Sequence, residues 1–484
     1  MDILFIASEA VPFAKTGGLA DVAGVLSRVL ANSEKVSLLL PEYKTEEIGK
    51  LALETVDSFP VQIGSRSFQA QIKKAAISSC FTVYFVSQEI FFAREFLYGD
   101  SSGAYPDNFL RFFFFQKASV EFIRRREMFF DIIHCHDWQT ALIPLLLKFP
   151  AAPPFLLKTK IVFSIHNLGY QGVFSGSFFK ETGLPDYLFS PEYLEFYGDL
   201  NFMKAGIIFS DWLFTVSSTY AQEILLSENG FGLDGLLKKY SFKLSGILNG
   251  VDYSQWNPET DRFIAYPYSQ RSLEIKKKNK EVLYRELEIA KNCHSPLLII
   301  ISRITEQKGI ALLLELFPVL LKEDLHFIIL GEGERSWTEK LQLLATQFPG
   351  QLTFLNRFDE RMAHRLEAAA DIFFMPSKYE PCGLNQIYSM KYATVPIVRA
   401  TGGLADSVED FDPNTEKGTG FKFASNEPAE IMLLIKKVLA LYHDKKTWRQ
   451  IQDNGMRADF SWEMVVPEYK KIYNKILGEA NDHG

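Results

Sequence analysis

Short runs of consecutive apolar residues alternate along the chain with longer segments in which apolar residues recur every three or four positions. The first run, Ile3–Ala7, predicts a buried strand. A helix that starts just after two glycines is predicted by the recurrence of apolar residues at Leu19, Val22, Leu26, Val29 and Leu30. Further runs typical of buried strands are Val36–Leu40, Phe81–Val86, Ile132–His136 and Lys160–Ile165. Because strands that alternate with helices usually pair in parallel, this half of the chain predicts a parallel sheet with helices on both faces.

The same alternation starts again in the second half of the chain. The predicted elements there are strands at Leu297–Ser302, His326–Leu330, Asp371–Met375 and Val395–Arg399, and a helix at Ile310–Leu321. The sequence therefore predicts two α/β domains. We expect the polar stretch Asn257–Lys280 to divide them, and we expect its basic run Lys276-Lys277-Lys278 to face solvent.

One short motif occurs twice. Thr16-Gly17-Gly18-Leu19-Ala20-Asp21 near the N-terminus recurs as Thr401-Gly402-Gly403-Leu404-Ala405-Asp406. Both copies follow a predicted strand and open a predicted helix, whose free N–H groups and partial positive charge attract anions. Paired glycines also suit a tight turn that binds nothing. Two copies, the first of them next to Lys15, favour an anion site at the carboxyl edge of each sheet.

Composition narrows the class of protein. Of the 484 residues, 52 are Lys or Arg and 59 are Asp or Glu, and the formal net charge of −7 argues against a nucleic-acid coat or a polybasic membrane anchor. The four cysteines are far apart, which excludes a zinc knuckle and a disulfide scaffold. No run approaches the ~18 consecutive apolar residues of a membrane span, and the N-terminus lacks the positive charge of a signal peptide. We expect a soluble cytoplasmic protein.

Two cations flank a predicted turn just after the strand Leu297–Ser302. Arg303 and Lys308 are five residues apart, so both can reach one anion, and a guanidinium fork beside a point charge suits a diphosphate. Either cation could instead pair with Glu306 at the surface. The position at a strand end favours the anion-binding interpretation.

A carboxylate and another glycine turn follow the strand Asp371–Met375. Glu380 stands before a proline, and Gly383 is expected to open a helix whose N–H groups face the loop. A carboxylate there can accept hydrogen bonds from sugar hydroxyls, although capping the helix is an alternative role. A nucleophilic role for Cys382 is rejected because no partner histidine is evident in the sequence.

Polar residues also end two strands in the first half of the chain. His134 and His136 share one face of the strand Ile132–His136, but two histidines do not make a metal site, and we expect none. Asp137 at the end of this strand is the stronger functional candidate, and His166 ends the next strand in the same way. Polar strand ends in both sheets favour a functional role over simple capping.

These motifs together resemble the bacterial and plant-type glycogen and starch synthases, glycosyltransferase family 5, over nearly the whole chain. The most diagnostic pair is Lys15-Thr16-Gly17-Gly18-Leu19 and Glu380-Pro381-Cys382-Gly383-Leu384. The other matching motifs are His136-Asp137-Trp138, His166-Asn167-Leu168-Gly169-Tyr170-Gln171-Gly172, Lys204-Ala205-Gly206, Leu248-Asn249-Gly250-Val251-Asp252, Ser302-Arg303 with Gln307-Lys308-Gly309, and Thr401-Gly402-Gly403-Leu404.

The resemblance implies an α/β fold of the GT-B type, in which two Rossmann-like domains have parallel sheets that face each other across a cleft. We expect an N-terminal, acceptor-side domain at residues 1–250, a nucleotide-sugar domain at 251–458, and a last helix in 459–484 that crosses back to the first domain. The implied reaction transfers glucose from ADP-glucose to the non-reducing end of an α-1,4-glucan such as glycogen, with retention and without a metal or other cofactor. Neither nucleic acid nor a membrane is an expected partner.

The resemblance also implies roles for residues of the second domain. Arg303 and Lys308 would neutralise the leaving diphosphate. Glu380 and the backbone of Cys382–Leu384 would hold glucose hydroxyls and phosphate, and Thr401–Gly403 would line the same site.

In the first domain the resemblance points to the loop near the N-terminus and to the strand ends. Lys15 and Gly18 would approach the same phosphates. His166 would lie near the transferred sugar, Asn249 would contact it, and Asp137 would position the acceptor or the sugar. No carboxylate can be assigned as a covalent nucleophile, so we favour same-face attack, with the leaving diphosphate helping to deprotonate the acceptor.

Three positions bear on the choice of donor. Phe358, in a predicted loop, falls where the family often has a tyrosine beside the base, so it keeps a stacking face and loses a hydroxyl. Asn385 replaces the usual threonine next to the phosphate site, and Tyr388 stands where related GT-B families place a glutamate for the ribose. UDP-glucose therefore stays open as an alternative donor.

Three other classes of protein fit the pattern less well. A glucan phosphorylase shares the GT-B fold but needs a lysine that holds pyridoxal phosphate and a much longer chain. A non-catalytic glucan-binding protein is disfavoured because Lys15, Arg303, Lys308 and Glu380 are all present. A dinucleotide-dependent oxidoreductase would need a third glycine after Gly331-Glu332-Gly333.

Overall fold

The computed structural model describes residues 1–100, 103–289 and 294–478, which form two compact units. The first unit comprises Met1–Val216, Ala221–Gly250 and the segment from Trp462 onward. The second comprises Ser217–Tyr220 and Val251–Ser461. The prediction that Asn257–Lys280 divides the domains is wrong, because this stretch lies wholly inside the second unit. Of the four cysteines, Cys293 lies outside the described residues.

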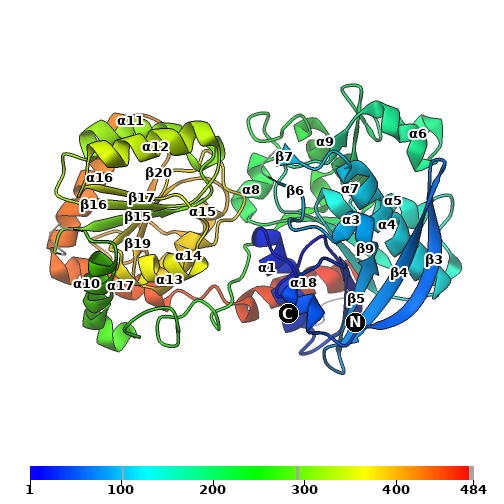
Figure 1. Cartoon of the computed structure of the whole chain (residues 1–484), viewed down its shortest axis with the longest axis horizontal. Coiled ribbons are helices and arrows are strands. Elements are labelled where there is room, and N and C mark those ends of the chain that lie inside the picture. Colours follow the sequence, from blue (N-terminus) through cyan, green and yellow to red (C-terminus); the bar gives the residue numbers. More distant parts are fainter. Residues whose placement is uncertain (101–102, 290–293, 479–484) are drawn as a thin grey trace. The chain divides into compact units, whose positions relative to one another are not determined.

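The first unit is built on a nine-stranded sheet with the strand order β14-β13-β9-β8-β1-β2-β5-β4-β3 (Figure 1). Neighbouring strands are parallel except where β4 pairs with β3 and β5. The strands are β1 Asp2–Ile6, β2 Lys35–Pro41, β3 Glu54–Ile63, β4 Arg66–Ala76, β5 Phe81–Ser87, β8 Ile132–His136, β9 Lys160–Ile165, β13 Trp212–Thr215 and β14 Leu244–Gly246. The five strands predicted in this half are confirmed, each to within one residue at either end.

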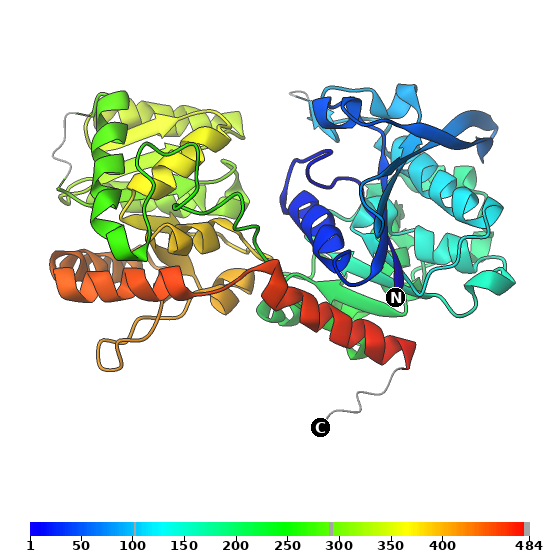
Figure 2. The ribbon, with the colours of Figure 1, turned by 90° about the horizontal axis from the view of Figure 1, so that it is seen from below.

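Helices cover both faces of this sheet (Figures 1 and 2). On one face α1 (Gly18–Leu30) packs against α18 (Trp462–Leu477), and α4 (Asn108–Arg125), α5 (Ile143–Lys148) and α7 (Phe202–Phe209) pack together on the other. The smaller elements are α2 Glu46–Gly49, α3 Glu89–Phe92, β6 Gly99–Asp100, β7 Gly103–Ala104, β10 Val173–Phe174, α6 Phe179–Thr182, β11 Glu195–Phe196, β12 Asp199–Asn201 and α9 Asp234–Lys239. Helix α8, Ser218–Glu223, begins in the segment Ser217–Tyr220 that is assigned to the second unit. The predicted helix is confirmed by α1, in which Leu19, Val22, Leu26 and Leu30 are buried and Val29 is half-buried.

The last helix is anchored to the first unit by its first residue. Trp462 is buried, and its indole lies against Gly250 so closely that a Cβ at position 250 would come within 2.6 Å of the ring. A glycine is therefore required at position 250 by packing.

The second unit holds a six-stranded, fully parallel sheet with the order β17-β16-β15-β18-β19-β20. Its strands are β15 Leu297–Ile301, β16 His326–Leu330, β17 Leu352–Leu355, β18 Ile372–Met375, β19 Val395–Arg399 and β20 Phe421–Phe423. Its helices are α10 Lys276–Glu286, α11 Ile310–Leu320, α12 Arg335–Gln347, α13 Glu360–Ala369, α14 Asn385–Lys391, α15 Gly402–Ser407, α16 Pro428–His443 and α17 Lys445–Arg457. The four strands and the helix predicted in this half are confirmed.

Alternate residues of β15 pack into different cores, as expected for a strand buried on both faces. Leu298 and Ile300 join an apolar cluster with residues of α11, α16 and α17. Leu297 and Ile299 join another cluster with residues of α10 and α13. Two covered faces leave the carboxyl edge of the sheet as the place where loops can bind a ligand.

The prediction that the whole basic run 276–278 faces solvent is wrong for its first residue. Lys276 is buried at the start of α10, and its ammonium donates to the carbonyls of Glu367 at 2.7 Å and Tyr392 at 2.8 Å and to Oγ1 of Thr394 at 2.9 Å. Burial lowers the pKa of Lys276 to about 7. Helical periodicity turns this first lysine inward, while the next two lysines of the run stay exposed.

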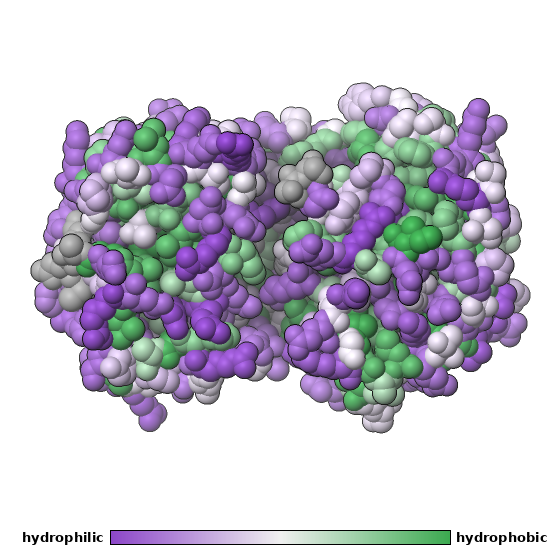
Figure 3. All heavy atoms as spheres, viewed as in Figure 1, coloured by the Kyte–Doolittle hydropathy of each residue, from purple (hydrophilic) through white to green (hydrophobic). Residues whose placement is uncertain are grey.

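The surface is of an ordinary mixed kind. On the face shown in Figure 3, hydrophobic residues are interspersed among hydrophilic ones over each unit. Within the described ranges, no helix combines the length and the apolar character that crossing a bilayer requires.

Candidate active site

Three neighbouring strands of the second unit end in polar residues that the sequence singles out. Arg303 follows β15, Glu380 lies in the loop after β18, and Thr401 follows β19. Because β15, β18 and β19 are adjacent and parallel, these loops share the carboxyl edge of one sheet. This is the edge at which open α/β sheets bind ligands.

Lys308 and Glu380 form a buried ion pair at this edge. The Lys308 ammonium lies 2.5 Å from Oε2 of Glu380, and the Ser377 hydroxyl donates to the same oxygen at 3.0 Å. The two paired side chains are only 13% and 8% exposed. The alternative pairing of Lys308 with Glu306 is wrong, because Glu306 pairs with Lys378 at the surface. A cation of the kind that binds a diphosphate and a carboxylate of the kind that accepts sugar hydroxyls are thus both held in place at this edge.

The second Thr-Gly-Gly copy is packed against the loop that carries Glu380. The Gly403 N–H donates to the carbonyls of Glu380 and Pro381, both at 3.1 Å. Gly402 has a φ of +43°, and a Cβ there would fall 1.9 Å from the Glu380 carbonyl oxygen. Thr401 is buried and precedes helix α15. The glycines of this copy are therefore required by the fold, since they let two loops meet.

The residues after Glu380 lead into helix α14. The helix begins at Asn385, two residues later than predicted, because Gly383 takes a left-handed conformation with φ +68°. Cys382 is buried, as expected for a packed thiol, and Leu384 precedes the first residue of the helix. The Asn385 amide donates to the Ile301 carbonyl at 2.7 Å and so ties the start of α14 to the end of β15.

The first Thr-Gly-Gly copy differs from the second in having open space around it. Gly18 is the first residue of α1, and in the described part of the chain no atom lies within 4 Å of a Cβ built at Gly17 or Gly18. Lys15, in the same exposed loop, donates to Asp21 at 2.8 Å. Neither glycine has a positive φ. Packing therefore does not require glycine here, which leaves room for a ligand to approach the backbone at the start of α1.

Glu9 holds this loop, although its role was not predicted from the sequence. Oε2 of Glu9 accepts hydrogen bonds from the backbone N–H of Thr16 at 2.5 Å and from its hydroxyl at 2.8 Å. Burial raises the pKa of Glu9 to about 7. The signal that could have found it is the one that marked Asp137, a carboxylate just beyond a predicted strand.

Asp137 and His166 lie together at the carboxyl edge of the first sheet. Asp137 follows β8 with the strained backbone values φ 55° and ψ −178°. Its Oδ1 accepts the backbone N–H of His166 at 2.7 Å, and its own N–H donates to Ser164 at 2.9 Å. Burial raises the pKa of Asp137 to about 8 and lowers that of His166 to about 3. At neutral pH this pair therefore consists largely of a protonated carboxyl group and a neutral imidazole.

Asn249 and Phe358, two further residues predicted to contact the donor, lie in different surroundings. Asn249 is buried just beyond β14, and its Oδ1 has no hydrogen-bond partner among the described residues. A buried acceptor without a partner is costly, which fits a group that binds a ligand donor. Phe358 is 80% exposed in the loop between β17 and α13. It does not pack in a core, so its ring face is available for stacking.

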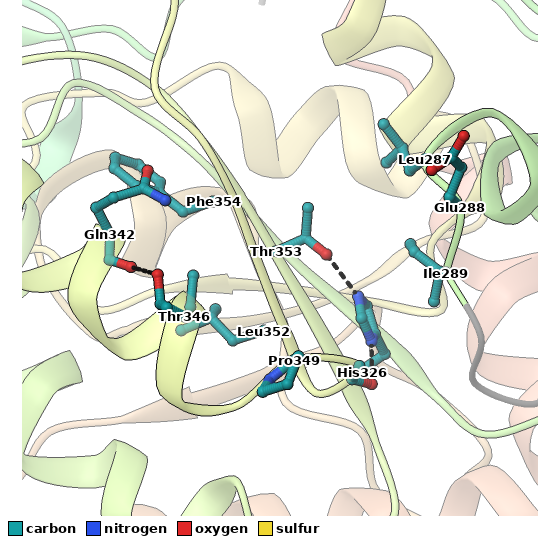
Figure 4. Close-up of a pocket in the computed structure, with 12 residues that line it drawn as sticks. Leu287, Glu288, Ile289, His326, Gln342, Thr346, Pro349, Leu352, Thr353 and Phe354 are labelled. Carbon is teal, nitrogen blue, oxygen red and sulfur yellow. Dashed lines mark hydrogen bonds between the residues drawn. The ribbon is translucent and has the colours of Figure 1, made fainter.

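A surface cavity lies at the other edge of the second sheet. It measures about 500 Å³ and is bordered by His326 and Leu352, the first residues of β16 and β17. Figure 4 shows the His326 ring hydrogen-bonded to Thr353 in its wall. None of the site residues that were predicted from the sequence lines this cavity. Likewise, no group of three or more His, Cys, Asp or Glu that could hold a metal ion occurs within residues 1–100, 103–289 and 294–478.

Comparisons with known proteins agree over the whole length of the chain. Residues 2–239 match the starch synthase catalytic domain, and residues 286–457 match glycosyl transferases group 1. A glycogen synthase from Koribacter versatilis is 43% identical over 477 residues, which cover 98% of each chain. Glycogen synthase 2 from Geobacter sulfurreducens is 41% identical over 476 residues, again 98% of each chain. The chain belongs to the glycogen and starch synthase family.

Solved structures support the same assignment. The catalytic domain of starch synthase IV from Arabidopsis thaliana, bound to ADP and acarbose, matches with a TM-score of 0.89 at 32% identity, over 98% of this chain and 99% of that one. Sucrose-phosphate synthase from Thermosynechococcus elongatus matches with a TM-score of 0.61 at 15% identity, over 99% and 100% of the two chains, and shows the fold alone. The chain is a glycosyltransferase with the GT-B fold. Membership in the synthase family excludes the phosphorylase and oxidoreductase alternatives.

Proposed function

We propose that this synthase transfers glucose from ADP-glucose to the non-reducing end of an α-1,4-glucan such as glycogen, with retention of the anomeric configuration. The observation that carries the proposal is the Lys308–Glu380 pair at the carboxyl edge of the second sheet. It places a cation for a diphosphate beside a carboxylate for sugar hydroxyls. The ADP bound in the Arabidopsis starch synthase structure supports an adenine nucleotide as the carrier.

The proposed leaving group is a nucleoside diphosphate, so the step that needs help is the build-up of negative charge on it. Lys308 is held in place by its bond to Glu380, and Arg303 stands at the end of β15 nearby in sequence. Prealigned cations stabilise such charge without reorganising during the reaction. The proposal therefore assigns this role to the two side chains and includes no metal ion.

We favour attack of the acceptor on the same face of the sugar from which the diphosphate leaves. A covalent route needs an ionised carboxylate that is free to attack. Oε2 of Glu380 is occupied by Lys308 and Ser377, and burial keeps Asp137 largely protonated at neutral pH. Both carboxyl groups are thus poorly suited as nucleophiles, and the leaving diphosphate remains as the base for the acceptor hydroxyl. A stable glucosyl-enzyme trapped on Asp137 or Glu380 would contradict this route.

The first test is transfer of labelled glucose to glycogen from ADP-glucose and, in parallel, from UDP-glucose, each with and without EDTA. We expect transfer from ADP-glucose that EDTA does not change. Preference for UDP-glucose would show that the donor is misassigned and direct attention to Phe358 and Asn385. Transfer from neither donor, with glycogen still bound, would favour the non-catalytic glucan-binding protein.

We further propose that the enzyme acts in the cytoplasm. Cys135 and Cys382 are buried and belong to no disulfide, which suits a reducing compartment. Fractionation of producing cells, with activity followed in the soluble and membrane fractions, tests this.

A further inference from the structure

A chain of buried polar groups connects the last helix to the predicted site of the first unit. The Tyr473 hydroxyl of α18 lies 2.7 Å from Nδ1 of His134, and the other ring nitrogen of His134 lies 2.7 Å from the Ser164 hydroxyl. The backbone carbonyl of Ser164 accepts the N–H of Asp137. Both ring nitrogens of His134 are thus hydrogen-bonded, which fixes the orientation of the ring. His136 lies two residues further along β8 and packs against it.

His136 packs on the ring of His134 and contacts His166. Its ring stacks on that of His134, with centroids 4.2 Å apart and planes at 24°, and on that of Phe5 at 5.6 Å and 19°. Its Nδ1 lies 2.9 Å from Nε2 of His166. Its Nε2 is buried and has no hydrogen-bond partner among the described residues.

One hydrogen must lie between His136 and His166, and there are two ways to place it. Burial lowers the pKa of both rings, so both are neutral and each carries a single N–H. If His166 donates from Nε2, the hydrogen of His136 must sit on its own buried, unpartnered Nε2. If His136 donates from Nδ1, only a bare nitrogen is left without a partner. Unpaired buried N–H groups are rarer than unpaired acceptors, which favours the second arrangement.

We propose that His136 is a positioning residue that fixes the ring of His166 with its hydrogen on Nδ1. This inference rests on the proposed function and deepens it. With Nε2 of His166 accepting from His136, the Nδ1–H becomes the only hydrogen-bond donor of the His166 side chain. His166 then meets the transferred sugar or its phosphates as a donor to an oxygen atom and does not act as a base.

Two substitutions at position 136 separate the hydrogen bond from the packing. His136→Phe keeps a ring to stack on His134 and removes the nitrogen that faces His166. His136→Asn keeps a donor near the position of Nδ1 and loses the ring. We expect His136→Phe to lower kcat for glucose transfer about 10- to 100-fold, with little change in the KM for glycogen, by analogy with the loss when the partner that orients a metal-ligating histidine is removed. We expect His136→Asn to recover most of that loss.

Tyr268→Phe is the matched control for a general loss of stability. It removes a buried hydroxyl that donates at 2.7 Å to the Tyr392 carbonyl in the second unit. We expect its kcat to stay within about threefold of wild type, because a contact outside the active site affects the stability of the protein more than the rate of glucose transfer. Equal kcat losses in His136→Asn and His136→Phe, or an unchanged kcat in His136→Phe, would overturn the inference.

A direct measurement on the wild-type enzyme keeps the inference testable even if His136→Phe fails to fold. Long-range nitrogen–proton NMR spectra of protein labelled with ¹⁵N-histidine distinguish the two neutral forms of each ring, and His166→Ala assigns the signal of His166. We expect His166 to carry its hydrogen on Nδ1. A hydrogen on Nε2 would overturn the inference without bearing on glucose transfer, whereas a wild-type enzyme that transfers no glucose would overturn the proposed function itself.

Discussion

The ammonium of Lys308 lies 2.5 Å from the carboxylate of Glu380, although the two residues are 72 positions apart in the chain. Both side chains are largely buried, so each is costly to leave without the other. Ser377 donates to the same carboxylate oxygen and fixes its direction. The pair therefore arranges the site before any substrate arrives, and its cation is the group that the proposed mechanism depends on most.

Replacing this cation tests the role of the pair in the reaction. We expect Lys308→Ala to lower kcat/KM for glucose transfer about 10²- to 10³-fold, because charge on the leaving diphosphate would lose a prealigned partner. The measurement is initial rate against ADP-glucose concentration, with circular dichroism to check the fold.

Lys436→Ala is the control for loss of a lysine. Lys436 pairs with Glu323 on the surface of the same unit, where such pairs contribute little. Its kcat/KM should stay within about twofold of wild type. Near-normal turnover in Lys308→Ala would show that the leaving-group role is misassigned.

The two Thr-Gly-Gly copies should respond in opposite ways to an added methyl group. A Cβ at Gly402 would fall 1.9 Å from the Glu380 carbonyl, so Gly402→Ala should lower the free energy of unfolding by about 1–3 kcal/mol or more. Gly18 has open space and opens α1, so Gly18→Ala should fold with unchanged or slightly higher stability. We nevertheless expect Gly18→Ala to raise the KM for the donor, because the methyl group occupies the space left for phosphate.

Urea unfolding and the KM for the donor, measured on both alanine variants, show whether the glycine of each copy is required for packing or for ligand binding. A destabilised Gly18→Ala, or a Gly18→Ala with unchanged donor KM, would contradict the assignment of the first copy to ligand binding. A Gly402→Ala as stable as wild type would contradict the packing argument for the second.

The exposed ring of Phe358 should contribute to donor binding. We expect Phe358→Ala to raise the KM for ADP-glucose about 5- to 20-fold, corresponding to the loss of about 1–2 kcal/mol of stacking on a base. Phe358→Tyr should keep the stacking and change KM little. Phe242→Ala removes another ring, 76% exposed on the first unit, and should leave the kinetics unchanged. Equal kinetics for Phe358→Ala and wild type would remove Phe358 from the site.

Much of the fold was predictable because it depends on local patterns. The buried strands of parallel sheets read as apolar runs, and the residues just after them identify the carboxyl edges where Asp137, Arg303 and Glu380 lie. The partners of these residues were not predictable. The choice of Glu380 over Glu306 for Lys308 depends on which loops the folded sheet brings together. The hold of Glu9 on Thr16 depends on the conformation of the single loop that joins β1 to α1.

Other predictions were wrong or incomplete because tertiary packing decides the surroundings of a single residue. Lys276 heads a run of three lysines that looks solvated, yet the turn of α10 points it at backbone carbonyls inside the second unit. The two Thr-Gly-Gly copies have the same sequence. Only their surroundings show that packing requires glycine in the second copy, whereas the glycines of the first copy have open space around them. Composition and periodicity carry no information on such surroundings.

Glu367 should make stability depend on pH in a direction that one substitution can test. It is 1% exposed on α13, and burial raises its pKa to about 8, against about 4.3 in an unfolded chain. Between these values the folded state keeps a proton that the unfolded state has released. The free energy of unfolding therefore falls as pH rises, by at most roughly 1.4 kcal/mol per pH unit for this one proton.

Glu367→Gln mimics the protonated carboxyl group and removes this dependence. Its side-chain oxygen can still accept the Ser389 hydroxyl, which lies 2.9 Å from Oε1 of Glu367. In urea unfolding at a series of pH values from about 5 to 8, the difference in stability between Glu367→Gln and wild type should therefore shift in favour of the variant as pH rises. Glu315→Gln changes an exposed glutamate of α11, and its free energy of unfolding should depend on pH in the same way as that of wild type. Parallel curves for Glu367→Gln and wild type would mean that Glu367 is ionised in the folded enzyme, with Lys276 beside it as its counter-charge.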